Sequence, residues 1–248
     1  EEAGQHADAV ALGEAEMIWL QVIEDFKKGS LQKFYKAEGR SDLQNLPIPR
    51  RDLLPKKAYF FTNTMQISRG CPFQCDFCSV TAFFGHTCRL RPLEEVRKEV
   101  ELLLQKTNFI FFVDDNIAAD PAYAEQLFKE ITPLRLRWFS QVSTTVVNHP
   151  RLVELAGASG CHEVILGIES IDDRNLADIN KKFNQVKRYP ELFRLLRSNG
   201  ISPHVSIIFG LDHDDENLLY RTLDFLIENE VMFFRVSMAT PYPGTDFY

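Results

Sequence analysis

Strand-like and helical segments alternate from residue 64 to residue 248, and this alternation restricts the possible folds more than any other feature of the sequence. Each short apolar run is followed by a segment whose apolar residues recur at helical spacing. Such alternation produces a parallel sheet, because a helix must carry the chain back before the next parallel strand can begin. The expected strands lie at 65–68, 109–113, 138–145, 163–168, 204–209 and 232–239, with helices at 92–103, 120–131, 149–157, 189–199 and 215–229.

The run at 109–113 is continuously apolar, which is typical of a parallel strand covered on both faces. At this point two arrangements of the sheet are open: an eight-stranded barrel that is truncated, or an open six-stranded one. In barrels of this kind the active site lies at the carboxyl ends of the strands. The residues that directly follow each strand are therefore the candidates for function.

Three cysteines, Cys71, Cys75 and Cys78, follow the first expected strand with the spacing C-x3-C-x2-C. Thiolates grouped this closely bind a metal or a metal cluster. Three ligands leave one of the four irons of a cubane cluster without a protein ligand. An open iron beside an aromatic side chain, here Phe77, indicates a catalytic site, whereas a closed site would be structural.

A structural zinc site is the alternative for this region. It would use Cys75, Cys78, His86 and Cys88 as ligands. The resulting spacing, C-x2-C followed by H-x-C, matches no zinc module that we can motivate, and zinc would leave the alternation downstream unexplained.

The run Ser-Arg-Gly-Cys-Pro-Phe-Gln-Cys-Asp-Phe-Cys at 68–78 resembles the radical S-adenosylmethionine (SAM) superfamily. The resemblance implies a partial (β/α)6 TIM-like barrel with the cluster directly after its first strand. It also implies that Cys71, Cys75 and Cys78 ligate a [4Fe–4S] cluster whose fourth iron is chelated by SAM. Reductive cleavage of SAM would then give a 5′-deoxyadenosyl radical that removes hydrogen from an unactivated carbon.

The resemblance assigns further residues to the cofactors. Phe77 matches the aromatic residue beside the adenine of SAM, although a core aromatic is the alternative. Asp114, Asp115 and Asn116 follow the second strand, where most relatives carry a Gly-Gly-Glu-like run that meets the SAM amino group. This chain departs from that run, so contact with SAM, contact with substrate and a simple polar turn all stay open.

A Gly-Ile-Glu-Ser run ends the fourth strand and recurs in the same family. The resemblance implies that Glu169, followed by Ser170, accepts hydrogen bonds from a ribose hydroxyl of SAM. Gly210, after the fifth strand, matches a segment that packs against adenine, where the missing side chain permits a close approach. A glycine needed only for helix–strand packing is the alternative at this position.

The amino-terminal residues suggest a second cofactor. A short strand at 9–12 precedes an amphipathic helix at 18–26, as in the last strand and helix of a doubly wound cobalamin-binding domain. We therefore expect a remnant of such a domain at 1–40, a linker at 41–63, and a barrel at 64–248 that is truncated at its carboxyl end. The alternative is that the amino-terminal residues are a helical extension of the barrel.

The runs Phe-Val-Asp-Asp-Asn and Ser-Arg-Gly-Cys-Pro-Phe together resemble the cobalamin-dependent radical SAM methylases, a class that includes the hopanoid C-2 methylases. The resemblance implies methylation of the carbon radical by methylcobalamin. Cyclisation, rearrangement and methylthiolation are alternative outcomes, and a metal-stabilised interaction module without turnover is an alternative of another class. A flavodoxin or ferredoxin is the expected electron donor.

Charge and composition limit the possible binding partners and the expected location of the protein. Lys and Arg number 28 against 35 Asp and Glu, a net charge of −7, which argues against nucleic acid as a partner. No apolar run approaches the length of a membrane span, and we find no signal peptide. The five cysteines form no disulfide framework, so we expect a reducing cytoplasm. The expected substrate is a small molecule, and the aromatic pair Phe83 and Phe84 is compatible with a lipid-like one.

Overall fold

The computed structural model describes residues 2–55, 59 and 62–248. The chain divides into two compact units, one ending at Gln44 and the other spanning Asn45–Tyr248. Each unit is described by itself.

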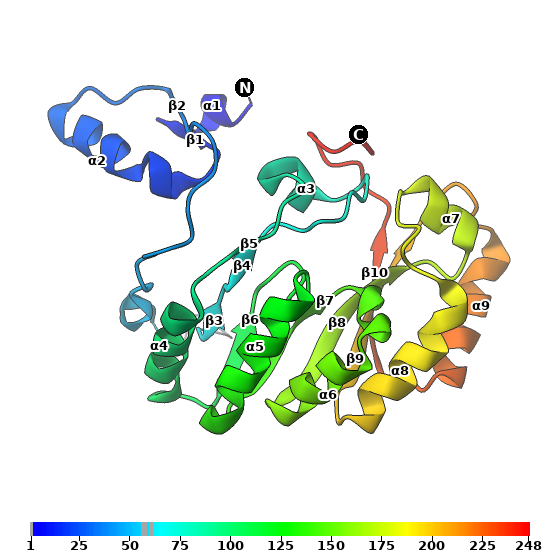
Figure 1. Ribbon diagram of the computed structural model, residues 1–248. Coiled ribbons are helices and arrows are strands. Elements are labelled where there is room, and N and C mark those ends of the chain that lie inside the picture. Colours follow the sequence, from blue (N-terminus) through cyan, green and yellow to red (C-terminus); the bar gives the residue numbers. More distant parts are fainter. Residues whose placement is uncertain (1, 56–58, 60–61) are drawn as a thin grey trace. The chain divides into compact units, whose positions relative to one another are not determined.

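The larger unit is built on a parallel sheet of six strands (Figure 1). The strands follow one another across the sheet in the order of the sequence, and every neighbouring pair is parallel. This arrangement confirms the six-stranded α/β fold. The strands are β3 (Thr64–Met65), β6 (Phe109–Phe112), β7 (Arg137–Val142), β8 (Cys161–Glu169), β9 (Ser202–Phe209) and β10 (Phe233–Met238).

Helices between the strands cover one face of this sheet (Figure 1). They are α4 (Leu93–Leu104), α5 (Pro121–Ile131), α6 (Pro150–Ala158), α8 (Tyr189–Ser198) and α9 (Glu216–Glu228). Asp120 begins α5 by accepting hydrogen bonds from the backbone N–H groups of Ala122 and Tyr123, and Pro121 needs no such partner. The largest core side chain on β7, Trp138, is completely buried and packs on Phe128 of α5. Helix and sheet thus meet along one continuous apolar layer.

The apolar run of β6 is not covered equally on its two faces. Ile110 and Phe112 are completely buried against the helices, whereas Phe109 and Phe111 are only half-buried on the opposite face. Phe111 stacks there on Phe139 of β7, with ring centroids 4.2 Å apart. The expectation of a strand fully covered on both faces was therefore wrong. Aromatic stacking inside the curved sheet explains the apolar run instead.

The expected strand at 65–68 consists of two short strands. β3 joins the large sheet, whereas β4 (Ser68–Arg69) pairs antiparallel with β5 (Arg89–Leu90). The chain leaves the large sheet after β3 because the buried carboxylate of Asp114, which follows β6, accepts hydrogen bonds from the backbone N–H groups of Ile67 and Ser68. These N–H groups would otherwise continue the ladder of the sheet. Two short helices, α3 (Ser79–Phe84) and α7 (Asp173–Asp178), were not expected from the sequence.

The smaller unit contains α1 (Ala3–His6), β1 (Val10–Leu12), α2 (Trp19–Lys28) and β2 (Phe34–Lys36). β1 and α2 lie where the sequence predicts a strand and a helix, and β2, which was not expected, runs parallel to β1. Tyr35 of β2 is buried and donates its hydroxyl to Asp25 of α2 at 2.9 Å. The assignment of this unit to a cobalamin-binding domain stays a prediction.

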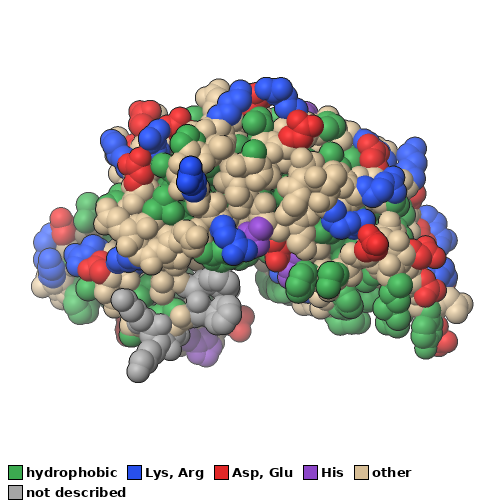
Figure 2. All heavy atoms as spheres, turned by 90° about the horizontal axis from the view of Figure 1, so that it is seen from below, with side chains coloured by type: hydrophobic (Ala, Val, Ile, Leu, Met, Phe, Trp, Pro, Cys, Tyr) green, Lys and Arg blue, Asp and Glu red, His purple; other side chains and the backbone are tan. Residues whose placement is uncertain are grey.

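The expected linker at 41–63 lies partly outside the described residues, since 56–58 and 60–61 are not described. Its described part contains one short 3-10 helix, Arg51–Leu53. No described helix combines the length and apolarity that crossing a bilayer requires. Figure 2 shows Lys and Arg interspersed with Asp and Glu over the described part of the face seen there, a mixture of charge and not a continuous basic surface.

Candidate active site

A cavity of about 340 Å³ opens at the carboxyl end of the large sheet. The thiols of Cys71, Cys75 and Cys78 all line it, so the structure brings the three predicted ligands to one place. The strand ends supply the other walls: Asp115 and Asn116 follow β6, Ser143 follows β7, Glu169 ends β8, and Ser237 lies near the end of β10. This location agrees with the expectation for barrels.

The cysteine loop is held by segments that lie far away in the sequence. The backbone N–H of Asp76 donates to the carbonyl of Ile179 at 3.2 Å, and its carbonyl accepts from the N–H of Phe247 at 3.0 Å. The side chain of Asn180 donates to the carbonyl of Gln74 at 2.7 Å. Tertiary contacts rather than local turn sequence therefore fix the conformation of the loop.

Burial raises the pKa of the Cys71 thiol and raises that of Cys75 to about 11. The neighbouring thiols contribute to both increases, and the positive charge of Lys181 opposes them. Without a metal these two thiols are protonated at neutral pH, so binding of a cluster must release protons.

The donor set fits an iron–sulfur cluster better than a single zinc ion. Among the residues that the structure describes, no three His, Cys, Asp or Glu side chains are grouped as ligands of one metal ion. This holds for the three predicted cluster ligands as well, but His86 and Cys88 of the alternative zinc site do not line the cavity that the three thiols share. Three thiols on one cavity wall are the soft ligands that iron–sulfur clusters use.

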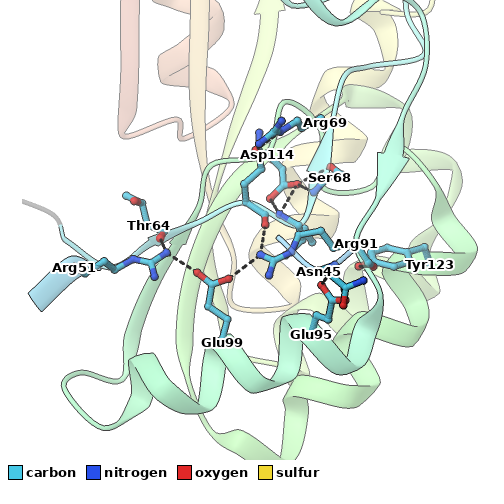
Figure 3. A network of polar contacts seen from close by, with 12 residues as sticks. Asn45, Arg51, Thr64, Ser68, Arg69, Arg91, Glu95, Glu99, Asp114 and Tyr123 are labelled. Carbon is cyan, nitrogen blue, oxygen red and sulfur yellow. Dashed lines mark hydrogen bonds and ion pairs between the residues drawn. The ribbon is translucent and has the colours of Figure 1, made fainter. Parts of the chain in front are cut away.

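Asp114 does not line the cavity and instead holds the strand that leads into the cysteines (Figure 3). Its carboxylate is completely buried and accepts hydrogen bonds from the N–H of Ile67 at 3.2 Å and from the N–H and hydroxyl of Ser68 at 2.5 Å each. Burial raises the pKa of Asp114 to about 7, although these hydrogen bonds act in the other direction. Its side chain is thus engaged with β4 and not with the cavity.

Asp115 both lines the cavity and contacts the cysteine loop. Its carboxylate accepts from the N–H of Gly70 at 3.2 Å, and burial raises its pKa. Gly70 has φ = +88°, and a β-carbon there would lie 2.1 Å from the carbonyl oxygen of Thr87. Only glycine can occupy this position, immediately before Cys71.

A buried network of ion pairs lies beside the residues that lead into the cysteine loop (Figure 3). Glu99 of α4, with 2% of its side chain exposed, lies between Arg51 at 2.6 Å and Arg91 at 2.8 Å. Arg51 also donates to the carbonyl of Thr64 at 2.6 Å, and Arg91 to that of Gln66 at 2.8 Å. The network thereby links the residues before β3 to the strands around the cysteine loop.

Replacing Glu99 by alanine is expected to lower the free energy of unfolding by about 3 kcal/mol, because two arginines would lose their common buried partner. Urea denaturation followed by circular dichroism measures the change. Glu101→Ala is the matched control: Glu101 pairs with Arg97 on the exposed face of the same helix, and its loss should cost less than about 0.5 kcal/mol. Equal effects of the two substitutions would contradict a structural function of the network.

Glu169 lines the cavity in an uncommon backbone conformation, with φ = +62°. The strand is irregular here, since the pairing of β8 with β9 shifts between Gly167 and Glu169. A β-carbon at Gly167 would lie 2.2 Å from Oε1 of Glu169. The bulge and the glycine together direct the Glu169 side chain into the cavity.

Lys181 is the partner of Glu169, and sequence reasoning missed it. Its Nζ donates to Oε1 of Glu169 at 2.7 Å and lies 5.5 Å from the ring centroid of Phe77 and 5.7 Å from that of Phe183. Burial opposes the charge of Lys181, but Glu169 and Cys75 outweigh burial and raise its pKa. The cavity therefore contains a buried cation between two aromatic rings and the cysteines.

The other predicted site residues divide into two groups. Phe77 and Asn116 line the cavity, and Asn116 accepts from the N–H of Ser143 at 3.1 Å. Ser170 and Gly210 do not line it. The hydroxyl of Ser170 accepts from the N–H of Asp172 at 3.1 Å, and the N–H of Gly210 donates to Asp214 at 2.7 Å. Both residues shape the turns behind the cavity.

Five further polar residues that line the cavity were also not predicted from the sequence. They are Gln141, Ser143, Ser206, Arg235 and Ser237. Alternation along β9 and β10 offers a signal for Ser206, Arg235 and Ser237, because residues two apart share a face. No pattern in the sequence points to Lys181.

Comparison with known proteins gives one family and several relatives. The family model of the Radical SAM superfamily matches residues 65–226. A bacteriochlorophyllide d C-12(1)-methyltransferase of Chlorobaculum tepidum is 30% identical over 100% of this chain and 56% of its own length. The hopanoid C-2 methylase of Rhodopseudomonas palustris is 25% identical over 94% of this chain and 46% of its own length. The chain thus spans about half the length of these relatives.

Two solved structures share the fold. The radical SAM methyltransferase TsrM of Kitasatospora setae, with cobalamin and a [4Fe–4S] cluster bound, has a TM-score of 0.67 and 21% identity, and the match covers 75% of this chain and 38% of TsrM. The cobalamin-dependent SAM radical enzyme OxsB has a TM-score of 0.70 and 17% identity, with 91% of this chain and 36% of OxsB covered.

Proposed function

The chain belongs to the radical SAM superfamily, and we propose that it binds a [4Fe–4S] cluster through Cys71, Cys75 and Cys78 and cleaves SAM reductively at that cluster. The observation that carries the proposal is the placement of all three thiols on one wall of a cavity at the carboxyl end of the sheet. Cys71, Cys75 and Cys78 would hold the cluster, which would supply the electron for SAM cleavage and so the radical chemistry that removes hydrogen from an unactivated carbon.

The chain's own residues orient SAM in this proposal. Glu169 accepts from a ribose hydroxyl through Oε2, since its Oε1 is taken by Lys181. Lys181 holds Oε1 of Glu169 at 2.7 Å and so fixes the direction of this carboxylate in the cavity wall. Phe77 presents an apolar ring for the adenine. Asp115 and Asn116 face the same cavity and are available to SAM or to the substrate.

Asp114, Ser170 and Gly210 act indirectly in the same proposal. They hold the backbone around the cavity and do not touch the cofactor, because their polar groups are bonded to neighbouring loops. The cluster loop and the strand ends are thereby fixed before SAM binds. Pre-organisation of this kind reduces the cost of binding.

Methylation of a small-molecule substrate with the help of cobalamin is the proposed outcome. The names of the relatives, which include several methyltransferases, support methylation, and the two structural neighbours are described with cobalamin. A remnant of the cobalamin-binding domain in the smaller unit is part of this proposal, supported by its parallel β1 and β2 and by α2. A flavodoxin or ferredoxin as electron donor and a cytoplasmic location complete it, since the cluster requires reducing conditions.

Electron paramagnetic resonance tests the central step. Wild-type protein is reconstituted with iron and sulfide under anaerobic conditions, reduced with dithionite, and measured with and without SAM. We expect a reduced-cluster signal that SAM perturbs, and no such signal in Cys75→Ala. Cys161→Ala is the matched control, because Cys161 is buried in the core away from the cavity. A wild-type protein that retains stoichiometric zinc and no cluster would reject the proposal in favour of a structural module.

A further inference from the structure

One cation of the cavity has no acidic partner among the residues that the structure describes. Arg235 of β10 lines the cavity, as do the three cysteines. Lys181, the other cation there, is neutralised by Glu169 at 2.7 Å. Among residues 2–55, 59 and 62–248 no carboxylate forms an ion pair with Arg235, whose one described polar partner is a serine.

The position of Arg235 is fixed by strand pairing. Arg235 is paired in register with Ser206 of β9, and Ser206 with Gly167 of β8. Nε of Arg235 donates to the hydroxyl of Ser206 at 3.1 Å, and Ser206 is buried. The side chain therefore turns inward across β9 although Arg235 is exposed at the edge of the sheet. With Nε engaged, the two Nη groups are left as donors.

The surroundings of Arg235 differ from those of Lys181. Gln141 and Ser143 of the β7 wall, and Ser206 and Ser237 of the neighbouring strands, line the same cavity with uncharged hydrogen-bonding groups. The cysteines, Phe77 and Lys181 belong instead to the loop over the strand ends and to the segment after α7. The cavity thus has one charged region beside the cluster ligands and a second one on the inner face of β9 and β10.

We propose that Arg235 binds an anionic group of the substrate, a carboxylate or a phosphate, in a subsite formed with Ser206 and Ser237. The proposal rests on the proposed function, because it assigns the region by Lys181 to SAM and the region by Arg235 to the molecule that SAM activates. The two free Nη groups of the guanidinium match two oxygens of such an anion, and hydroxyls complete its hydrogen bonds. An uncharged lipid would offer no anionic partner to the Nη groups of Arg235.

Binding of matched probes tests the subsite. Benzoate, benzamide and phenyl phosphate are titrated into cluster-containing protein saturated with SAM, and binding is measured by ligand-detected NMR. Benzoate and benzamide differ in charge while having nearly the same shape. We expect an anion, benzoate or phenyl phosphate, to bind at least about tenfold more tightly than benzamide, and Arg235→Gln to remove this preference. The better of the two anions then identifies the class of substrate.

Two further variants keep the test decisive. Arg235→Lys should retain part of the preference, since the charge stays while the paired donors are lost. Arg221→Gln removes an exposed arginine of α9 that pairs with Asp215, and it should behave as wild type. Equal binding of benzoate and benzamide by wild type, or an unchanged preference in Arg235→Gln, would overturn the proposal.

The SAM-dependent change in the reduced-cluster signal separates this proposal from the proposed function. We expect the reduced-cluster signal of Arg235→Gln to respond to SAM at the same SAM concentrations as that of wild type, because Arg235 binds the substrate and not SAM. If the variant instead loses its response to SAM while keeping its cluster, Arg235 binds SAM and the substrate subsite is rejected. If wild type forms no SAM-responsive cluster, the proposed function fails first.

Discussion

Asp114→Ala is expected to lose more than half of the iron that wild type retains after reconstitution, although Asp114 does not line the cavity that Cys71, Cys75 and Cys78 share. The substitution leaves three donors directly before the cysteine loop without this acceptor: the N–H groups of Ile67 and Ser68 and the hydroxyl of Ser68. Each lost hydrogen bond costs about 1 kcal/mol, so the free energy of unfolding should fall by about 3 kcal/mol. Iron and sulfide analysis and urea denaturation measure the two effects.

Asp114→Asn distinguishes the hydrogen bonds from the charge. The amide oxygen still accepts from β4, so most of the iron should be retained. Asp114 also predicts a pH effect: its pKa is raised to about 7 when folded, so between about pH 4 and pH 7 the folded protein holds a proton that the unfolded chain has released. The stability of wild type should therefore fall with rising pH over this window, more steeply than that of Asp114→Asn. Parallel pH profiles would show that Asp114 does not titrate in this way.

Lys181→Met is expected to weaken SAM binding by at least about tenfold while leaving the cluster in place. Methionine keeps the length of the side chain, but Glu169 would remain in the cavity wall without its counter-ion. Oε1 would lose the hydrogen bond that fixes the direction of the carboxylate, and the acceptor that we assign to the ribose would lose its fixed position. Titration of the reduced-cluster signal with SAM measures the affinity, and the iron content shows whether the cluster is retained.

The neighbouring lysine provides the control for this prediction. Lys182 is exposed, whereas Lys181 is buried. Lys182→Met therefore removes the same charge without breaking the ion pair between Lys181 and Glu169. Lys181→Arg should recover part of the SAM affinity, which a purely steric function of Lys181 would not explain. Unchanged SAM affinity in Lys181→Met would contradict the assignment of Glu169 and Lys181 to the cofactor.

The sheet was predictable from the sequence because periodicity is a local property. Six apolar runs separated by amphipathic helices gave the order and direction of the strands, and the C-x3-C-x2-C spacing located the cavity wall. The interpretation of 109–113 failed because two causes give the same pattern. Phe109 and Phe111 are apolar to stack inside the curved sheet, while Ile110 and Phe112 are apolar to pack on helices.

The polar part of the site was harder to predict because it depends on contacts between distant segments. Asp114 and Asp115 are adjacent in sequence, yet one is bonded to β4 behind the cavity and the other faces into it. Lys181 lies twelve residues after Glu169 in a loop that resembles any charged surface loop, and only the fold brings the two together. Strand alternation predicts which face of β10 Arg235 lies on, but only the fold shows that no carboxylate in the described part of the chain forms an ion pair with it.

The long-range bonds of the cysteine loop also determine when that loop can take its final form. Asn180 is 106 residues from Gln74, and Phe247, which is bonded to Asp76, lies beyond the last strand. Contacts of such sequence separation form late in folding, after most of the loop-closure entropy has been lost. On the ribosome, the three cysteines emerge long before the segments that order them. We therefore expect the proposed cluster to be inserted at the end of folding, after β10 has joined the sheet.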